Sequence, residues 1–182
     1  MKHKVTKLFV DFEKEEKWIN EMAAKGLNFT NYSIGKYSFQ EGKPGEYIYR
    51  LELLKELPGH AESQAYIKFM EETGVECVDT YMRWVFFRKK AEDGVFDLYS
   101  DYDSRIKHYE RIIWLLGVVG VVNLMTAIFN VGIGLTIGRP NGFYGNLYIS
   151  VASWSIVLLF GSIIVSYLKK IKKLKLEKRL YE

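Results

Sequence analysis

The sequence predicts an α+β protein: an N-terminal antiparallel sheet with two helices, broadly ferredoxin-like, followed by a two-helix transmembrane hairpin. Three observations predict this class. Residues 112–138 and 143–168 are apolar stretches without a charged residue. Residues 1–100 alternate between the apolar period of strands and that of helices. Finally, the run WINEMAAKGL at 18–27 recurs as YIKFMEETGV at 66–75, an offset of 48 residues that indicates two β-α-β-β repeats.

The first repeat is expected to begin with a strand over residues 4–10, where apolar side chains alternate moderately. Residues 12–25 follow helical spacing, and Gly26 ends this helix because glycine readily adopts a positive φ. Two short strands follow, around Phe29 and Phe39. The apolar stripe of the helix contains Trp18, Ile19, Met22 and Ala23. The predicted solvent face contains Glu13, Glu16, Lys17 and Glu21.

The second repeat has the same order of patterns. Residues 46–54 alternate as a strand, residues 60–73 have helical spacing, and residues 75–79 and 82–88 read as two more strands. We expect a last strand over residues 95–99. The predicted apolar stripe of the second helix contains Ala65, Tyr66, Phe69 and Met70.

The charge is distributed unevenly along the chain. Residues 1–110 contain 17 Lys/Arg and 20 Asp/Glu, a net charge of −3, whereas residues 111–182 contain 9 and 2, a net charge of +7. The globular part therefore lacks the positive charge that supplies most affinity for nucleic acids, which argues against such a partner. Cys77 is the only cysteine, so no intrachain disulfide can form, as suits a domain facing a reducing cytoplasm.

The predicted boundaries follow from the apolar stretches. A cytoplasmic domain over residues 1–100 precedes a juxtamembrane linker or helix at 101–111, and spans at 112–138 and 143–168 are joined by an extracytoplasmic turn at 139–142. Each span exceeds the roughly 20 residues that cross a bilayer as a helix. A basic cytoplasmic tail, residues 169–182, completes the chain.

Basic residues flank the spans on one side. The turn contains only Arg139, while Lys and Arg side chains precede the first span and follow the second. By the positive-inside rule, both termini are expected in the cytoplasm, with the lipid bilayer as a partner. The tail either is a solvated flank that continues the helix or binds anionic headgroups or a partner helix. The tail residues assigned to the membrane surface are Lys169, Lys170, Lys172 and Lys173.

Small and polar side chains interrupt the spans. Gly134 with Gly138, and Ser162 with Ser166, have the four-residue spacing that lets helices approach closely. They predict packing within the hairpin or, alternatively, self-association or a partner helix. Asn123 is expected to find a hydrogen-bond partner on the other helix, since unpaired polar groups are unfavourable in lipid. Neither span contains a charged residue, which argues against an ion pathway.

The sequence contains no recognisable catalytic constellation, phosphate-binding loop or zinc-ligand spacing, so we expect no catalytic, cofactor-binding or metal-binding residues. The acidic segment from Asp97 to Asp103 includes an Asp-x-Asp that could hold a metal, but a charged linker explains it better. Aromatic side chains alternate on two strands and predict either an open interaction face or a covered packing layer. This face consists of Tyr47, Tyr49, Trp84 and Phe86.

Three runs in the domain resemble one bacterial family, catalogued as domain of unknown function 2812. They are KWINEMAAKGL at residues 17–27, PGEYIYRL at 44–51 and RWVFFRK at 83–89. Leu27 stands where that family usually has an aromatic residue. The resemblance implies a membrane protein of the bacterial plasma membrane, often encoded beside a PadR-type transcriptional regulator and without an assigned chemistry.

We therefore expect a non-enzymatic, membrane-anchored interaction or sensory module that faces the cytoplasm. The resemblance implies a role in envelope-stress or antibiotic-response regulation together with a PadR-type regulator. The alternative is an accessory or immunity-type subunit of a membrane transporter. The expected partners are the bilayer and a protein, either such a regulator or transporter or a second copy of the chain. No cofactor is expected.

Overall fold

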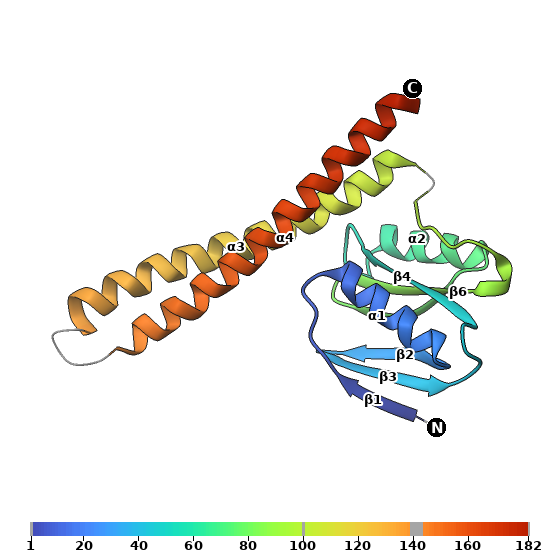
Figure 1. Ribbon diagram of the computed structural model, residues 1–182, viewed down its shortest axis with the longest axis horizontal. Coiled ribbons are helices and arrows are strands. Elements are labelled where there is room, and N and C mark those ends of the chain that lie inside the picture. The colour runs from blue at the N-terminus through green and yellow to red at the C-terminus, as the bar shows by residue number, and fades with distance from the viewer. Residues whose placement is uncertain (1, 100, 139–143, 182) are drawn as a thin grey trace. The chain divides into compact units, whose positions relative to one another are not determined.

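The computed structural model describes residues 2–99, 101–138 and 144–181, and the chain divides into two compact units, Met1–Ser100 and Asp101–Glu182. The first unit contains the two predicted β-α-β-β repeats (Figure 1). The first repeat consists of β1 (Lys2–Thr6), α1 (Phe12–Ala24), β2 (Leu27–Ser33) and β3 (Lys36–Glu41). The second consists of β4 (Tyr47–Leu53), α2 (Ala61–Glu72), β5 (Glu76–Tyr81) and β6 (Trp84–Lys90), followed by the short 3₁₀ turn η1 (Ala91–Asp93).

The two repeats share their topology as well as their element order. Each forms a three-stranded antiparallel sheet in which the last strand lies in the middle, β1-β3-β2 and β4-β6-β5. Each sheet has a shift in register at the same place, between Phe29 and Asn31 in β2 and between Cys77 and Asp79 in β5. These positions differ by 48 residues, so the structure confirms the repeat that the sequence predicts.

The sequence predicts one antiparallel sheet with two helices, but the structure has two sheets with α1 between them (Figure 1). β2 and β5 are neighbours, yet side chains interrupt the backbone pairing where they meet. The Asp79 carboxylate accepts hydrogen bonds from the Tyr32 backbone N–H at 2.6 Å and from Asn31 Nδ2 at 2.9 Å. The Asp79 side chain thus occupies a backbone N–H donor that pairing between β2 and β5 would need. The sheet is therefore divided where both strands have their register shifts.

Two hydrophobic cores lie on opposite faces of the second sheet. The first fills the space around α1, between the sheets, and the second lies between the second sheet and α2 (Figure 1). Buried residues of the first core are Ile19, Ala23, Phe29, Tyr37, Phe39, Tyr49, Leu51 and Phe86. Buried residues of the second core are Leu54, Met70, Val75, Val85, Phe87 and Phe96. The second sheet is thus covered on both faces.

Three local predictions are wrong. β1 ends at Thr6, and residues 7–10 form no strand. Residues 95–99 also form no strand, because β2 lies along one edge of the second sheet and α1 along the other, which leaves no strand to pair with. Met82 lies not in a strand but in the turn between β5 and β6, with a φ of 53°.

The predicted stripe of the second helix is also partly wrong. Met70 and Tyr66 pack into the second core, but Phe69 is 58% exposed and Ala65 is exposed. The buried face instead runs through Ser63, Tyr66, Ile67 and Met70. Ser63 satisfies this interior position because its hydroxyl donates to the Glu56 carbonyl at 3.1 Å.

The second unit is a pair of long helices. α3 (Tyr102–Ile133) continues through a π-helical segment, η2 (Gly134–Gly138), and α4 (Gly145–Tyr181) runs antiparallel to α3 (Figure 1). Both are long and apolar enough to cross a membrane. The predicted linker or helix at residues 101–111 is the first part of α3, with Asp101 as its cap, and the basic tail continues α4. The predicted turn at 139–142 lies outside the described residues.

Candidate functional site

The aromatic residues predicted as a candidate interaction face belong to the interior of the domain. Tyr49 and Phe86 are 0% and 2% exposed, and both lie in the first core. Tyr47 and Trp84 are partly buried against the same core. The alternative of a covered packing layer is therefore the one found, and its cover is α1 with the first sheet.

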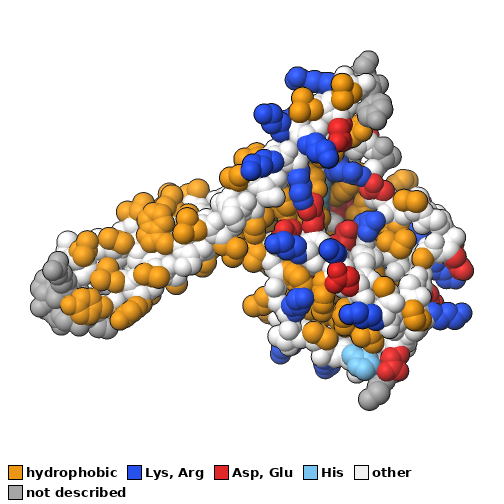
Figure 2. Space-filling model, in the orientation of Figure 1, with side chains coloured by type: hydrophobic (Ala, Val, Ile, Leu, Met, Phe, Trp, Pro, Cys, Tyr) orange, Lys and Arg blue, Asp and Glu red, His pale blue; other side chains and the backbone are white. Residues whose placement is uncertain are grey.

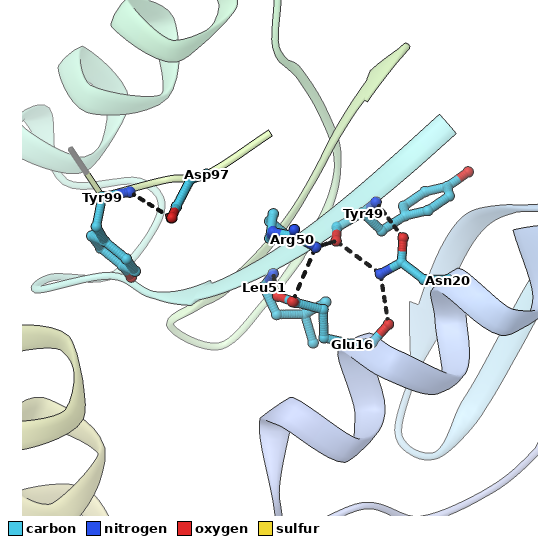
Figure 3. Close-up of polar contacts among 7 residues, drawn as sticks. All are labelled: Glu16, Asn20, Tyr49, Arg50, Leu51, Asp97 and Tyr99. Atoms are coloured by element: carbon cyan, nitrogen blue, oxygen red, sulfur yellow. Dashed lines mark hydrogen bonds and ion pairs between the residues drawn. The ribbon is translucent and has the colours of Figure 1, made fainter. Parts of the chain in front are cut away.

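Side chains of α1 line the outer edge of β4 (Figure 3). Asn20 Oδ1 accepts a hydrogen bond from the Tyr49 backbone N–H at 2.9 Å, and Asn20 Nδ2 donates to the Tyr49 carbonyl at 3.0 Å. The amide thus pairs with the strand as a neighbouring backbone would. An unpaired strand edge invites association with another chain, so Asn20 both closes this edge and joins the two repeats.

Glu16 makes the next contact along the same edge (Figure 3). Its Oε2 accepts from the Leu51 backbone N–H at 2.9 Å, and its Oε1 lies 3.2 Å from Arg50 Nη1. Burial raises the pKa of Glu16, while the hydrogen bond from Leu51 and the charge of Arg50 act in the opposite direction. The prediction of a solvated position is wrong for Glu16, because its carboxylate is used to hold β4.

The connection after α1 is interlocked with the turn before β4. Gly26 has a φ of 81°, and a Cβ there would lie 2.9 Å from the Gly42 carbonyl oxygen. The Gly45 backbone N–H donates to the Ala23 carbonyl at 2.9 Å, and Glu46 Oε2 accepts from Asn28 Nδ2 at 3.1 Å. Two of the runs that resemble the family thus contact each other, and their polar groups hold the repeats together.

A carboxyl-phenol pair lies on the other side of α1. Tyr37 donates its hydroxyl to Glu15 Oε1 at 2.7 Å, and the Tyr37 ring packs against Tyr32 and Trp18. Burial raises the pKa of Glu15 to about 7, and the hydrogen bond from Tyr37 offsets only part of that rise. Burial and the neighbouring Glu15 carboxylate also raise the pKa of Tyr37.

The raised pKa means that the Glu15 carboxyl takes up or releases a proton near neutral pH rather than in the acidic range, while the Tyr37 hydroxyl, whose pKa is also raised, keeps its proton. Perturbed carboxyls of this kind mark functional positions more often than ordinary surface carboxyls do. Sequence reasoning missed the pair, since Glu15 resembles its charged neighbours in α1. The repeat offers the one available signal: the position equivalent to the partly buried Glu15 is Ser63, which is buried.

The acidic segment is used for local structure. Asp97 accepts from the Tyr99 backbone N–H at 3.1 Å, as drawn in Figure 3. Asp101 caps α3 by accepting from Ser104 N at 2.7 Å, and Asp103 pairs with Lys178 at 2.8 Å. Within residues 2–99, 101–138 and 144–181, no three His, Cys, Asp or Glu side chains are grouped to hold a metal ion.

The residues predicted for helix packing behave differently from one another. Gly134 allows close approach, because a Cβ there would lie 2.6 Å from Leu147 Cδ2 of α4. Gly138 ends η2, and its surroundings lie outside the description. Ser162 and Ser166 are exposed on α4, so neither packs within the hairpin. The prediction of an interhelical hydrogen bond is wrong for Asn123, which donates to Val119 O of its own helix at 2.9 Å.

An interhelical bond comes from a residue that sequence reasoning did not select. Ser150 is buried, and its hydroxyl donates to the Ala127 carbonyl of α3 at 3.0 Å. In the tail, Lys169, Lys172 and Lys173 are exposed, whereas Lys170 lies over the Tyr167 ring at 5.6 Å. Their assignment to a membrane surface stays a prediction.

These features define a class of protein: a two-repeat α+β domain followed by a hairpin of two helices that are long and apolar enough to cross a membrane. The chain belongs to the family described as protein of unknown function (DUF2812), which matches residues 11–121, more than half of its length. The match begins after β1 and extends into α3. No curated protein and no solved structure matches the chain.

Proposed function

We propose that the protein is a two-span protein of the bacterial plasma membrane that holds its α+β domain in the cytoplasm as an interaction or sensory module. The observation that carries this proposal is the outward-facing apolar surface of the hairpin. Only 17% and 11% of the most apolar windows of α3 and α4 are buried. Figure 2 shows hydrophobic side chains over the outer surface of these helices. Such a continuous apolar surface is unfavourable in water, and a bilayer would cover it.

The charges support the orientation. Lys and Arg side chains gather at the end of the hairpin formed by the start of α3 and the end of α4, as Figure 2 illustrates for α4. Lys178 pairs there with Asp103 at 2.8 Å, and Lys175 lies 4.0 Å from Glu110. By the positive-inside rule, this end is cytoplasmic, and the domain that precedes α3 is on the same side.

Cysteine accessibility in intact cells tests the topology. Single cysteines at Lys43, Asn141 and Leu176, each in a Cys77→Ser background, are treated with a membrane-impermeant maleimide. We expect labelling at position 141 in intact cells, and labelling at 43 and 176 only after lysis. Labelling of position 43 or 176 in intact cells would reject the proposed orientation.

The role of the domain as a module is supported by how its polar groups are used. Asn20 and Glu16 bind the β4 backbone, so their role is structural. Glu15, by contrast, has a pKa raised to about 7 and can change its protonation state near neutral pH. The partner that the family resemblance suggests is a PadR-type regulator. We expect the full chain, purified from host membranes in mild detergent, to retain a stoichiometric partner or ligand; recovery of the protein alone would count against a module.

The exposed side of α4 favours one alternative, an accessory subunit of a membrane transporter. Ala152, Ser155, Ser162 and Ser166 are small and exposed, and they follow one another at intervals of three, seven and four residues, which places them on one side of the helix, as at helix-helix contacts in membranes. Deletion of the chain separates the two functions. A change in resistance to drugs or peptides without a change in transcription supports the accessory role, and a transcriptional change supports the module.

A further inference from the structure

The two equivalent turns of the repeats place large apolar side chains in solvent. Ile34 lies between β2 and β3 and is 71% exposed, and Met82 lies between β5 and β6 and is 70% exposed. Both have a left-handed backbone, with φ values of 37° and 53°. Glycine or asparagine would occupy such positions with less strain, and for a β-branched residue this conformation is rare. An apolar side chain is therefore kept at each turn despite unfavourable backbone geometry.

Both turns belong to one end of the domain. β2 and β5 are neighbours, and the rings of Tyr32 and Tyr81, which precede the turns, lie 5.0 Å apart. The segment after β1 joins them, since the Lys7 backbone N–H donates to the Gly35 carbonyl at 2.8 Å. This segment adds two exposed apolar side chains. We call the resulting surface the loop end; its apolar residues are Leu8, Val10, Ile34 and Met82.

Lysines border the loop end. Lys7 is exposed in the segment after β1, and Lys36 is exposed beside the turn between β2 and β3. Lys4 lies on the same face of the first sheet as Lys36. The acidic groups nearby are Asp11 just before α1, Glu15 in α1, and Asp79 of β5, which accepts from the Tyr32 backbone N–H at 2.6 Å. Asp11 accepts from the Glu13 backbone N–H at 3.1 Å as the helix cap, and Glu15 bonds to Tyr37 below the surface. An apolar tip with a lysine border is the composition of segments that lie in an anionic membrane interface.

We propose that the loop end inserts into the anionic lipid interface of the membrane to which the hairpin anchors the chain. This inference rests on the proposed membrane location. Ten helical residues, 102–111, precede the apolar run of α3 and span about 15 Å. A domain of about 100 residues has a radius of gyration of about 13 Å, so this tether keeps it within reach of the surface. At the resulting high effective concentration, a small apolar tip suffices for docking.

Fluorescence quenching by labelled lipids tests the insertion. The full chain, in a Cys77→Ser background, carries an environment-sensitive fluorophore on a single cysteine at Ile34, Met82, Val118 or Lys43. Lys43 is a matched exposed control, because the turn between β3 and β4 lies at the opposite end of the first sheet. Each protein is reconstituted in phosphatidylcholine vesicles, with or without phosphatidylglycerol, that contain a lipid with a nitroxide near the headgroup boundary.

We expect lipid quenching at positions 34, 82 and 118, and none above background at 43. Quenching at 34 and 82 should be stronger with phosphatidylglycerol, and replacing Lys7 and Lys36 with Gln should weaken docking by about fivefold for each lysine. A Leu8→Cys variant, which avoids the left-handed backbone, provides a second site should labelling at 34 or 82 disturb the fold.

The outcomes separate the two proposals. Quenching at 118 without quenching at 8, 34 or 82 rejects insertion of the loop end and leaves the membrane anchor intact. Absence of quenching at 118 rejects the membrane location itself. A blue shift at 34 and 82 that lipid nitroxides do not quench, and that grows with protein density in the vesicle, would show that a second copy covers the loop end and would overturn the proposal.

Discussion

The two repeats have the same order of strands and helix, yet their helices play different parts. α1 lies between the two sheets, where Ile19 and Ala23 are 0% and 1% exposed. α2 lies on the outside of the second sheet, and its equivalent of Ile19, Ile67, is only partly buried. The equivalent of Asn20, which pairs with β4, is the exposed Lys68.

This difference shows how a repeated unit acquires one integrating element. β4 is an edge strand, because β6 is the only strand that pairs with it in the second sheet. α1 fills that edge with side chains, whereas α2 covers a face and closes no edge. Equivalent positions in the two helices therefore form matched pairs: substitution in α1 should affect the whole domain, and substitution in α2 should act locally.

The largest expected effect is at the core pair. Ile19→Ala should lower the free energy of unfolding of the domain by about 2–5 kcal/mol, because it leaves a cavity between the sheets. Ile67→Ala removes the same atoms from a partly buried site and should lower it by less than half as much. Pulse proteolysis of the full chain in urea and mild detergent measures both. Equal losses would contradict the central position of α1.

The next effect depends on pH. The pKa of Glu15 is raised from about 4.5 to about 7, so its protonated form stabilises the fold. That contribution is complete below about pH 4.5 and is lost as the pH rises through 7; it amounts to about 3 kcal/mol. Glu15→Gln should remove this part of the pH dependence, as measured by urea midpoints from pH 4.5 to 8. An unchanged profile would show that Glu15 does not titrate there. Ser63→Ala, at the equivalent position, should shift all midpoints alike.

A smaller effect is expected at the edge of β4. Asn20→Ala removes both hydrogen bonds to the Tyr49 backbone and should lower the free energy of unfolding by about 1–3 kcal/mol. Lys68→Ala, the equivalent change in α2, should have an effect within about 0.5 kcal/mol, as is usual at the surface. Faster hydrogen exchange at the Tyr49 amide in the first variant alone would locate the loss. Similar effects of the two substitutions would argue against an edge contact.

The smallest effect concerns the place where equivalent positions of the repeats meet. Asn31→Asp places a second carboxylate opposite that of Asp79 and should lower the free energy of unfolding by about 1 kcal/mol. Adding Asp79→Asn restores a donor opposite an acceptor and should recover most of that loss. A double-mutant cycle on urea midpoints measures this coupling. Strictly additive losses would show that the two side chains do not act as a pair.

Much of the fold could be predicted because local patterns determine it. The offset between Trp18 and Tyr66 locates both helices, and Gly26 and Gly74 end them with φ values of 81° and 84°. The division into two sheets could not be predicted, because it depends on Asp79, a polar residue that reads as an ordinary strand position. The exposed position of Phe69 was missed for a similar reason: size suggests burial, but packing follows the face of Met70.

The candidate site was harder to predict than the fold. Glu15 and Glu16 are adjacent in sequence and look alike, yet one bonds to Tyr37 and the other to the backbone of Leu51. Which carboxyl is buried against which partner depends on contacts between elements distant in sequence. The loop end had a signal in the repeat alignment, since Ile34 and Met82 are 48 residues apart. The sequence alone does not show that these two apolar residues have a left-handed backbone or that they are exposed.

The unbroken length of α3 has a mechanical consequence. Its 32 residues form a helix about 48 Å long that begins after the Asp101 cap and packs along most of its length against α4. A rod embedded in a bilayer is a lever with its fulcrum near the membrane midplane. In the proposed membrane location, the apolar run 112–138 is centred near residue 125, about 35 Å along the helix from Tyr102. Because helices respond to changes in bilayer thickness by tilting, a tilt of about 10° would move the end of α3 next to the domain sideways by about 6 Å. Thinning of the membrane would thereby become a displacement at the point where the domain is attached.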